Sequence, residues 1–315
     1  MADGPSPFKQ RLRLVWLLVL CAGCLLLTGV TAFSFWRFDH FRLDIVAQFR
    51  PQYAFGCCAL LLLALLSKCR RIAWITGISC ILNLWQILSI PNVQPPLPDK
   101  PSYRVLSLNL YLENKQSAQV LDLINRSQPD ILLLIETQLL LPQLAASLRK
   151  IYPYQLLSWS YTPNGMVLYS KYPLKKAPDA PPSVSAAEVA LGGDSLWLVG
   201  CHPPSPRTQN FYEKRNQYYQ ELAKFVRKQS GSMLVFGDFN SAPWAPTFRH
   251  FLANSKLTMV NSRYWRQPTW PSNKFWMGVP IDHFLYTGGV RALEQYRSDS
   301  AGSDHYSIQM AFQLE

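Results

Sequence analysis

Polar side chains follow several apolar strands of the predicted fold, at the points where the strands end. At such points, carboxylates and amides can bind a metal ion or orient water, and an imidazole can move a proton. Side chains two residues apart on an extended chain point the same way. The carboxylate and the amide of Gly-Asp-Phe-Asn at 237–240 therefore face one region. The polar residues at or beside these strand ends are Asn109, Glu136, His202, Asp238, Asn240, Asp282, Asp304 and His305.

Each of these residues also has an ordinary structural explanation. Asp238 and Asn240 could close a turn through backbone hydrogen bonds, Glu136 could cap a helix, and His202 could be a satisfied turn histidine. These explanations account poorly for several carboxylates at one rim, because like charges repel unless a cation or a proton intervenes. A hard divalent ion with oxygen ligands would remove that repulsion.

The elements that must position these residues alternate between strands and helices. Helical patterns occur at 116–127, 139–150, 207–228 and 246–254. Because several strands are joined by hairpins, the order favours mixed sheets with helices outside over a doubly wound parallel sheet. The predicted strands are 103–111, 131–135, 154–157, 166–169, 186–191, 196–200, 233–236, 281–286 and 306–312.

From about Tyr103 to Phe312 the chain resembles the endonuclease/exonuclease/phosphatase superfamily, which has the DNase I-like fold. The resemblance implies an α+β (α/β) four-layer sandwich of two mixed β-sheets flanked by helices. It also implies Mg²⁺- or Mn²⁺-dependent hydrolysis of phosphate esters, by a nuclease or a phosphodiesterase, in a cleft at the edge of the sheets. The matching elements, in family order, are the strand with Asn109, Leu-Ile-Glu136, Cys-His202-Pro, Gly-Asp238-Phe-Asn240, Ile-Asp282-His and Ser-Asp304-His305.

The resemblance also implies roles for the metal-side and water-side residues. Glu136 would be the principal metal ligand, assisted by Asn109 and Asp304. Asp238 would position or deprotonate the attacking water, and Asn240 would bind a non-bridging phosphate oxygen.

The two histidines complete the implied site. His305, oriented by Asp282, would stabilise the transition state or serve as a base, because a carboxylate partner fixes the tautomer of an imidazole. His202 would protonate the leaving oxygen. Family members that cleave at abasic sites carry a tyrosine at that point, so this chain departs from that subgroup.

Five further residues are weaker candidates for substrate contacts. Arg215 and Asn216 lie on the longest predicted helix, Asn114 lies on the loop after the first strand, and Asn164 lies in a turn. Trp276 belongs to an aromatic and basic loop that could stack on bases, lie at membrane headgroups or cover a sheet. For Arg215 and Asn216 a solvated helix face is the structural alternative.

Three uncharged apolar stretches in the first third of the chain match the length needed to cross a bilayer core of about 30 Å. We expect three transmembrane helices, because the first stretch exceeds the core of a signal peptide and two more follow. The predicted divisions are a membrane anchor at 1–90 with spans at about 14–36, 51–67 and 72–90, a Pro-rich linker at 91–101, and an endonuclease/exonuclease/phosphatase catalytic domain at 102–315.

Basic residues predict the orientation of this anchor. Lys and Arg cluster at 9–13 and at 68–71, which a three-span arrangement puts on the same side. That side should be cytoplasmic, so the large domain should be extracytoplasmic. Because Cys201 is the single cysteine after residue 98, the domain holds no internal disulfide. We expect an integral protein of a bacterial inner or plasma membrane.

The net charge does not by itself indicate nucleic-acid binding. The formal charge is +12, but residues 1–98 contain 9 of the 31 basic and 3 of the 19 acidic residues. The excess left for the large domain is mild, and a domain that tracks nucleic acid by charge alone is usually more basic.

The sequence therefore predicts a membrane-anchored, metal-dependent phosphoesterase, either a nuclease or a lipid phosphodiesterase. Its partners would be a phosphate-ester substrate (nucleic acid or a lipid headgroup) and the lipid bilayer, reached through the N-terminal helices; no protein partner can be deduced. The alternative is a catalytically silent binding or scaffold protein that keeps the DNase I-like fold at the membrane.

Overall fold

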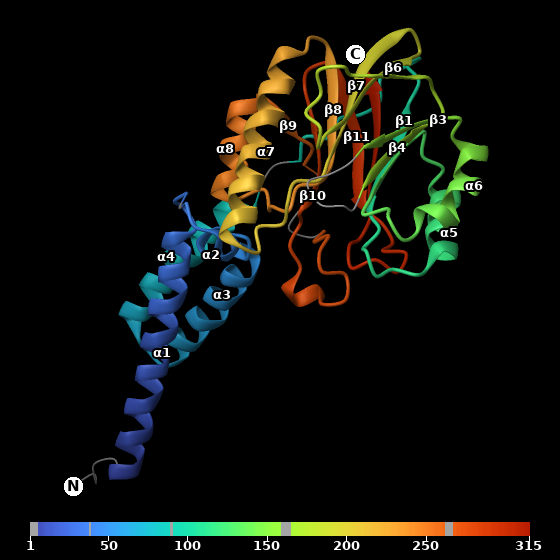
Figure 1. The fold of residues 1–315 in the computed structure, drawn as a ribbon. Helices are drawn as coiled ribbons and strands as arrows, with labels where there is room; N and C mark the ends of the chain where they lie inside the picture. Colours follow the sequence, from blue (N-terminus) through green and yellow to red (C-terminus); the bar gives the residue numbers. More distant parts are fainter. Residues whose placement is uncertain (1–5, 38, 89–90, 159–164, 262–266) are drawn as a thin grey trace. The chain divides into compact units, whose positions relative to one another are not determined.

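The computed structural model describes residues 6–37, 39–88, 91–158, 165–261 and 267–315. The chain separates into two compact units, Met1–Leu88 and Ser89–Glu315 (Figure 1).

The first unit is a set of helices with an apolar exterior. Side chains such as Leu25, Phe55 and Trp74 are about three-quarters exposed, which is unusual for a water-facing surface. The helices are α1 (Pro7–Phe33), α2 (Phe41–Ala47), α3 (Arg50–Leu66) and α4 (Arg70–Ile87).

The prediction of three transmembrane helices is corrected by the helix geometry. Within the described part of the chain, α1 is the one single helix long and apolar enough to cross a membrane. A second span is possible if α2 and α3 act together, but the pair is bent by 61°. The third predicted span, α4, begins with two arginines and buries the polar side chains of Thr76, Ser79 and Asn83.

A buried arginine joins the helices of this unit from inside. Arg50 has no exposed surface and donates to the Oδ1 atom of Asn83 at 3.4 Å. Its guanidinium also lies 4.3 Å from the centre of the Phe35 ring. The Asn83 amide in turn donates to Thr31 Oγ1 at 2.7 Å, so α1, α3 and α4 are joined by polar contacts.

The second unit contains two six-stranded sheets, with orders β11-β12-β1-β2-β4-β3 and β5-β6-β7-β8-β10-β9. Both are mixed: β1 and β2 are parallel, as are β7 and β8, and the remaining pairs are antiparallel. The strands are β1 (Tyr103–Asn109), β2 (Ile131–Ile135), β3 (Tyr154–Ser158), β4 (Met166–Ser170), β5 (Leu174–Lys176), β6 (Ser185–Leu191), β7 (Asp194–Cys201), β8 (Ser232–Asp238), β9 (Thr258–Met259), β10 (Asp282–Tyr286), β11 (Val290–Arg297) and β12 (Ile308–Leu314).

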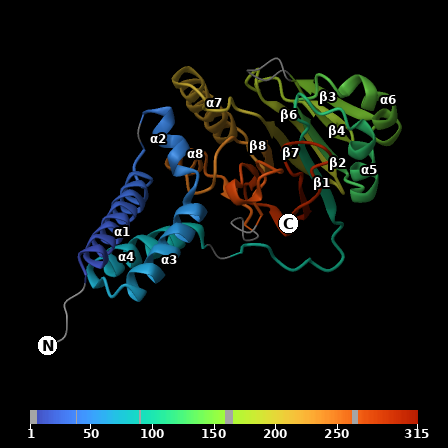
Figure 2. The ribbon, with the colours of Figure 1, turned by 90° about the horizontal axis from the view of Figure 1, so that it is seen from below.

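The sheets stack face to face, with helices outside both. Alternate residues of a strand point to opposite faces, so Ile131 and Leu133 of β2 enter the core between the sheets while Leu132 and Leu134 face the helices. Helices α5 and α6 cover one sheet, and α7 and α8 cover the other (Figure 2). The helices are α5 (Ser117–Ser127), α6 (Leu141–Ile151), α7 (Gln209–Lys228) and α8 (Pro246–Ser255), with a short 3₁₀ helix η2 (Phe275–Met277).

These four layers agree with the sandwich that the sequence predicts, but three strands were missed. The strands β5 and β9 have three and two residues, which is too short to show the alternation of apolar and polar residues that marks a strand. The eight residues of β11 carry charged and polar side chains at a sheet edge and lack the apolar run used to find the others.

The Pro-rich segment predicted as a spacer is bonded to the second unit. The backbone N–H of Asn92 donates to the Asn261 carbonyl at 3.1 Å, and its side chain bonds the backbone of Met259 and Asn261 at 2.8 and 2.7 Å. Val93 packs against the core between the sheets. This part of the linker therefore belongs to the folded domain.

Candidate active site

Topology brings the predicted site residues to one edge of the two sheets. The parallel strands β1 and β2 end at this edge, β1 with Asn109 and β2 just before Glu136. The parallel strands β7 and β8 end there too, β7 just before His202 and β8 with Asp238. The antiparallel strand β10 begins where β8 ends, so Asp282 lies directly opposite Asp238. The strand order, rather than nearness in sequence, assembles the cluster.

A glycine allows two of these strand ends to approach closely. Gly237 has φ = 137°, and a Cβ atom there would lie 2.2 Å from the carbonyl oxygen of Cys201. Any other residue would force β7 and β8 apart at the point where they present His202 and Asp238. The glycine of the Gly-Asp-Phe-Asn segment is therefore a packing requirement of the site.

Asp238 is held by amides on both sides. Its Oδ1 atom accepts the backbone N–H of Asn240 at 2.7 Å, and its Oδ2 atom accepts from the Asn109 side chain at 3.2 Å. Asn240 has φ = 50°, and its side-chain amide donates to the Pro203 carbonyl at 3.0 Å and to Asp238 Oδ2 at 3.4 Å. Burial and the neighbouring Asp282 carboxylate raise the pKa of Asp238 above its ordinary value.

His305 lies between two buried carboxylates. Its Nδ1 atom is 3.1 Å from Asp282 Oδ2, and its Nε2 atom is 3.8 Å from Asp238 Oδ2. Burial alone would lower the pKa of His305, but the two carboxylates outweigh it and raise that pKa to about 10. At neutral pH this imidazole is therefore a cation.

His202 is in the opposite charge state. Its Nε2 atom is 3.7 Å from Glu136 Oε1 and 3.8 Å from Asp238 Oδ2, and its side chain is almost entirely buried. Burial and the charge of His305 lower the pKa of His202 to about 4. The site thus pairs a neutral histidine with a charged one.

Glu136 stands at the more open side of the cluster. Its backbone has φ = 56°, and its Oε2 atom accepts the Leu112 N–H at 3.2 Å. Burial raises the pKa of Glu136, the nearby Asp304 carboxylate adds to this, and a hydrogen bond from Asn109 opposes it. Left-handed backbone at a non-glycine residue is strained, and such strain concentrates at functional sites.

The residues Glu136, Asn109 and Asp304 carry oxygen ligands of the kind that a hard divalent ion prefers. Asp304 accepts from the Trp270 indole through Oδ2 at 2.9 Å, while its buried Oδ1 atom has no hydrogen-bond partner among the described residues. That atom, the Glu136 carboxylate and the side-chain oxygen of Asn109 are carboxylate and amide oxygens, the ligands that Mg²⁺ and Mn²⁺ prefer.

A second group also lies close enough to share an ion. Ligand atoms of Asp238, Asp282 and His305 lie within 4.8 Å of one another. The His305 imidazole of this group is engaged with the Asp282 carboxylate, so an ion held here would compete with that pairing. There are therefore two candidate places for a divalent ion, this group and the oxygen-bearing residues around Glu136.

Two of the five weaker candidates for substrate contacts, Arg215 and Asn114, are buried and hydrogen-bonded inside the second unit. Arg215 is fully buried on α7 and donates to the Asn240 carbonyl at 3.3 Å, so it supports the Asp238–Asn240 turn from below. Asn114 is buried and bonds the Ala301 carbonyl and the Gln116 N–H at 3.1 and 2.8 Å. Both side chains are engaged inside the protein rather than presented at its surface.

The other three weaker candidates are Asn216, Trp276 and Asn164. Asn216 is half-buried on α7, and its Oδ1 atom has no partner among the described residues. Trp276 is 66% exposed on η2. Asn164 lies outside the described residues.

Sequence reasoning missed the residues that orient the acids. Thr269 Oγ1 accepts the backbone N–H groups of Ile281 and Asp282 at 3.0 and 3.2 Å, and Trp270 holds Asp304. Tyr219 donates to the Phe239 carbonyl at 2.6 Å. A tyrosine or threonine that bonds a distant backbone group leaves no local pattern, so no sequence signal pointed to them.

Comparison with known families agrees with this architecture. The sequence model of the Endonuclease/Exonuclease/phosphatase family matches residues 106–305, which include all eight strand-end residues. The chain belongs to this family. None of the curated proteins compared with the chain matches it.

Solved structures share the fold of the second unit at low sequence identity. An endonuclease/exonuclease/phosphatase from Beutenbergia cavernae has a TM-score of 0.51 at 17% identity, over 68% of this chain and 72% of its own. A humanised D. rerio TDP2 has a TM-score of 0.51 at 16% identity, over 68% and 99%. A truncated Caenorhabditis elegans TDP2 has a TM-score of 0.50 at 15% identity, over 68% and 98%.

Proposed function

We propose that this protein is a membrane-anchored, divalent-metal-dependent phosphoesterase that hydrolyses a phosphodiester or phosphomonoester. The observation that carries the proposal is the gathering of Asp238, Asp282, His202 and His305 with Glu136 at one sheet edge. Membership of the Endonuclease/Exonuclease/phosphatase family supports it.

Glu136, Asn109 and Asp304 would hold Mg²⁺ or Mn²⁺. When bound, such an ion supplies positive charge against the phosphate oxygens and stabilises the charge of the transition state. The Oδ1 atom of Asp304 has no hydrogen-bond partner among the described residues, which supports its place in this set. The remaining steps fall to side chains of the chain itself.

Asp238 would act on the attacking water. Its carboxylate is held in one orientation by Asn240 and Asn109, and its raised pKa makes it a stronger base than an exposed aspartate. As the water oxygen bonds to phosphorus and the bond to the leaving oxygen breaks, the water proton passes to Asp238 Oδ2.

The two histidines would bind the phosphate in different ways. The charged His305, fixed by Asp282, would stabilise the negative charge that spreads over the phosphate oxygens. His202 is neutral at pH 7, so we propose that it donates a hydrogen bond toward the leaving oxygen instead of delivering a full proton. Asn240 would face a non-bridging oxygen, after yielding one of its present hydrogen bonds.

The substrate would be a nucleic acid or a lipid headgroup, and the anchor would be α1, the longest apolar helix. The exposed Trp276 beside the start of β10 supports a role in contacting either bases or headgroups. An extracytoplasmic position for the domain, supported by the basic clusters, is also part of this proposal. So is a bacterial membrane, which the lack of an internal disulfide in the domain and the compact anchor support.

The test is hydrolysis by the full chain in detergent micelles, with Mg²⁺, with Mn²⁺ and with a chelator. The substrates are a chromogenic phosphodiester and phosphomonoester, an oligonucleotide and phospholipid vesicles. We expect metal-dependent turnover that Asp238→Asn abolishes, whereas Asp122→Asn, on the exposed face of α5, leaves it unchanged. Equal rates for wild type and Asp238→Asn on every substrate would refute the proposal and leave a scaffold.

A binding measurement separates the enzyme from the scaffold independently of turnover. Calorimetry with Mn²⁺ should show a site in the wild type that Glu136→Gln weakens by about ten- to a hundredfold. A scaffold need not bind the ion, so unchanged binding in Glu136→Gln would remove this residue from the metal site.

A further inference from the structure

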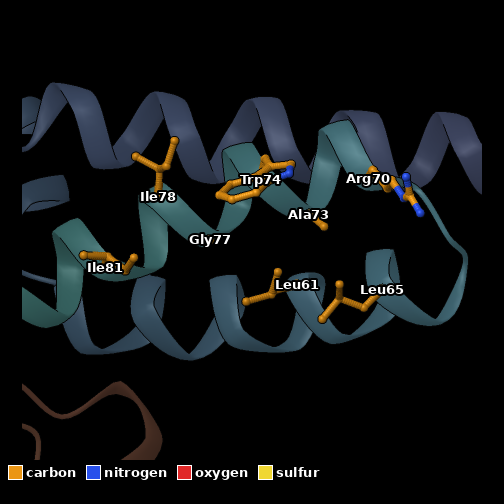
Figure 3. A pocket seen from close by; sticks show the side chains of 8 residues that line it. All are labelled: Leu61, Leu65, Arg70, Ala73, Trp74, Gly77, Ile78 and Ile81. Atoms are coloured by element: carbon orange, nitrogen blue, oxygen red, sulfur yellow. The ribbon is translucent and has the colours of Figure 1, made fainter.

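A groove in the first unit combines an apolar floor with the positive charge of an arginine. It lies between α3 and α4, has a volume of about 420 Å³, and has Arg70 as its one charged lining residue. The other residues that line it are Leu61, Leu65, Ala73, Trp74, Gly77, Ile78 and Ile81 (Figure 3).

Arg70 marks one end of this groove. Figure 3 shows it beside the turn between α3 and α4, with Ile81 at the opposite end. Its side chain is exposed and forms no ion pair or hydrogen bond with any residue in the described part of the chain. The sequence has no acidic residue between Asp44 and Asp99, so no local carboxylate neutralises this end.

The apolar part has the length of one lipid chain in one leaflet. From Arg70 to Ile81 the helix rises about 16 Å, at ~1.5 Å per residue. One leaflet of hydrocarbon is about 15 Å thick. Trp74, which is 75% exposed, stands one turn from the charge, where tryptophan occurs at membrane interfaces.

A glycine keeps the groove open. A Cβ atom at Gly77 would meet just one side chain within 4 Å, the Cδ1 atom of Leu61 at 3.9 Å. The floor at this point is therefore empty space between two helices. A Cβ atom at Gly77 fits at ordinary van der Waals distance, so a larger side chain there would extend into the groove.

We propose that this groove binds an anionic phospholipid, with one acyl chain along the floor and the phosphate on Arg70. The occupant follows from charge complementarity, since basic pockets between helices at the membrane surface bind acidic headgroups. A zwitterionic lipid could fill the floor, but its choline group would lie beside the guanidinium. The inference rests on the proposed membrane anchor and is independent of the phosphoesterase activity.

The experiment is lipid retention by the full chain in nanodiscs of mixed phosphatidylglycerol and phosphatidylcholine. After extraction, native mass spectrometry counts the lipids that stay bound. We expect one phosphatidylglycerol per chain, with retention falling about fivefold in Arg70→Gln, as expected for one basic residue at a surface. Gly77→Leu should lower retention of either lipid by filling the floor.

The matched control is Arg71→Gln, which removes the same charge from a neighbour that does not line the groove. It should retain the lipid as the wild type does. Equal retention of the two lipids by the wild type, or equal losses in Arg70→Gln and Arg71→Gln, would overturn the proposal. A chain that fails to enter nanodiscs refutes the anchor and the groove together, while the hydrolysis assay still stands.

Discussion

Replacing Arg215 by methionine tests how the site is supported from beneath. This arginine has no exposed surface, and its guanidinium donates to the Asn240 carbonyl at 3.3 Å. It also lies 5.3 and 5.7 Å from the ring centres of Tyr212 and Tyr219. Methionine keeps a similar unbranched length between the rings and removes both the donor and the charge.

The cost to folding can be bounded from these contacts. Loss of the donor to a part-buried carbonyl costs about 1–3 kcal/mol, and the two cation–π contacts are worth about 0.5–2 kcal/mol each. Because domains of this size are stable by about 5–15 kcal/mol, the variant should fold with lowered stability.

The effect on hydrolysis should exceed the effect on binding. Asn240 adopts φ = 50° and donates its N–H to Asp238, so the freed turn would displace the carboxylate that acts on water. A displacement of about 1 Å can cost a hundredfold in rate. We expect kcat to fall by about ten- to a hundredfold, with KM nearly unchanged because Arg215 does not contact the substrate.

The assay is steady-state hydrolysis of the phosphodiester by the full chain, with thermal unfolding measured beside it. Arg215→Lys, which keeps a donor and the charge, should recover part of the lost kcat, and Lys214→Met on the exposed face of α7 should match the wild type. A raised KM with unchanged kcat would refute this reasoning, because Arg215 would then contact the substrate. If Arg215→Met fails to fold, the kcat of Arg215→Lys tests the same reasoning, because a lysine that restores only part of the support should still lower kcat.

Three further predictions concern stability. Because the pKa of His305 is raised, its pairing with the Asp282 and Asp238 carboxylates stabilises the fold fully below about pH 6.5, and this stabilisation is lost as the pH rises toward 10. In metal-free urea unfolding, the free energy of unfolding should fall by about 1 kcal/mol per pH unit from pH 7 to 9. The fall should be less steep in Asp282→Asn. An equal slope in both proteins would contradict the pairing. Gly237→Ala should lower stability by ~3 kcal/mol or more, because its Cβ meets a backbone carbonyl and its φ is positive; a loss under ~1 kcal/mol would show that the strands can separate. Removing residues 89–101 from the second unit should cost about 2–4 kcal/mol through the lost hydrogen bonds of Asn92, and equal urea midpoints would show that the segment is only a spacer.

Four site residues, Asn109, Glu136, His202 and Asp238, could be found from the sequence because each ends or follows an apolar strand, whereas Asp282, Asp304 and His305 stand at or before the start of one. Strand periodicity is a local property, so Ile131–Ile135 and the residue after it were identifiable without any tertiary contact. The order of the motifs then indicated the family. The same local reasoning overestimated the anchor. Helix α3 has 17 residues and would make a span only together with the bent α2, and α4 begins with two arginines and carries several polar side chains.

The protonation of the two histidines was decided by the tertiary structure. In the sequence, His202 and His305 are equivalent imidazoles beside strand ends. Their pKa values move in opposite directions because His305 lies between two carboxylates, whereas the pKa of His202 is lowered mainly by burial. Asp304 beside His305 contributes to this difference, but Asp282 and Asp238, which raise the pKa of His305 most, are distant from it in the sequence.

The sequence by itself determined which residue types stand at the strand ends, and with them the family and the kind of chemistry. The tertiary structure decided how those residues face one another: Asp282 opposite Asp238 through strand register, and Arg215 beneath Asn240 through the packing of α7. The physical reason is the distance along the chain over which each kind of interaction acts. Strand and helix patterns arise from neighbours in the chain, whereas charge state, orientation and support depend on groups that only folding brings together.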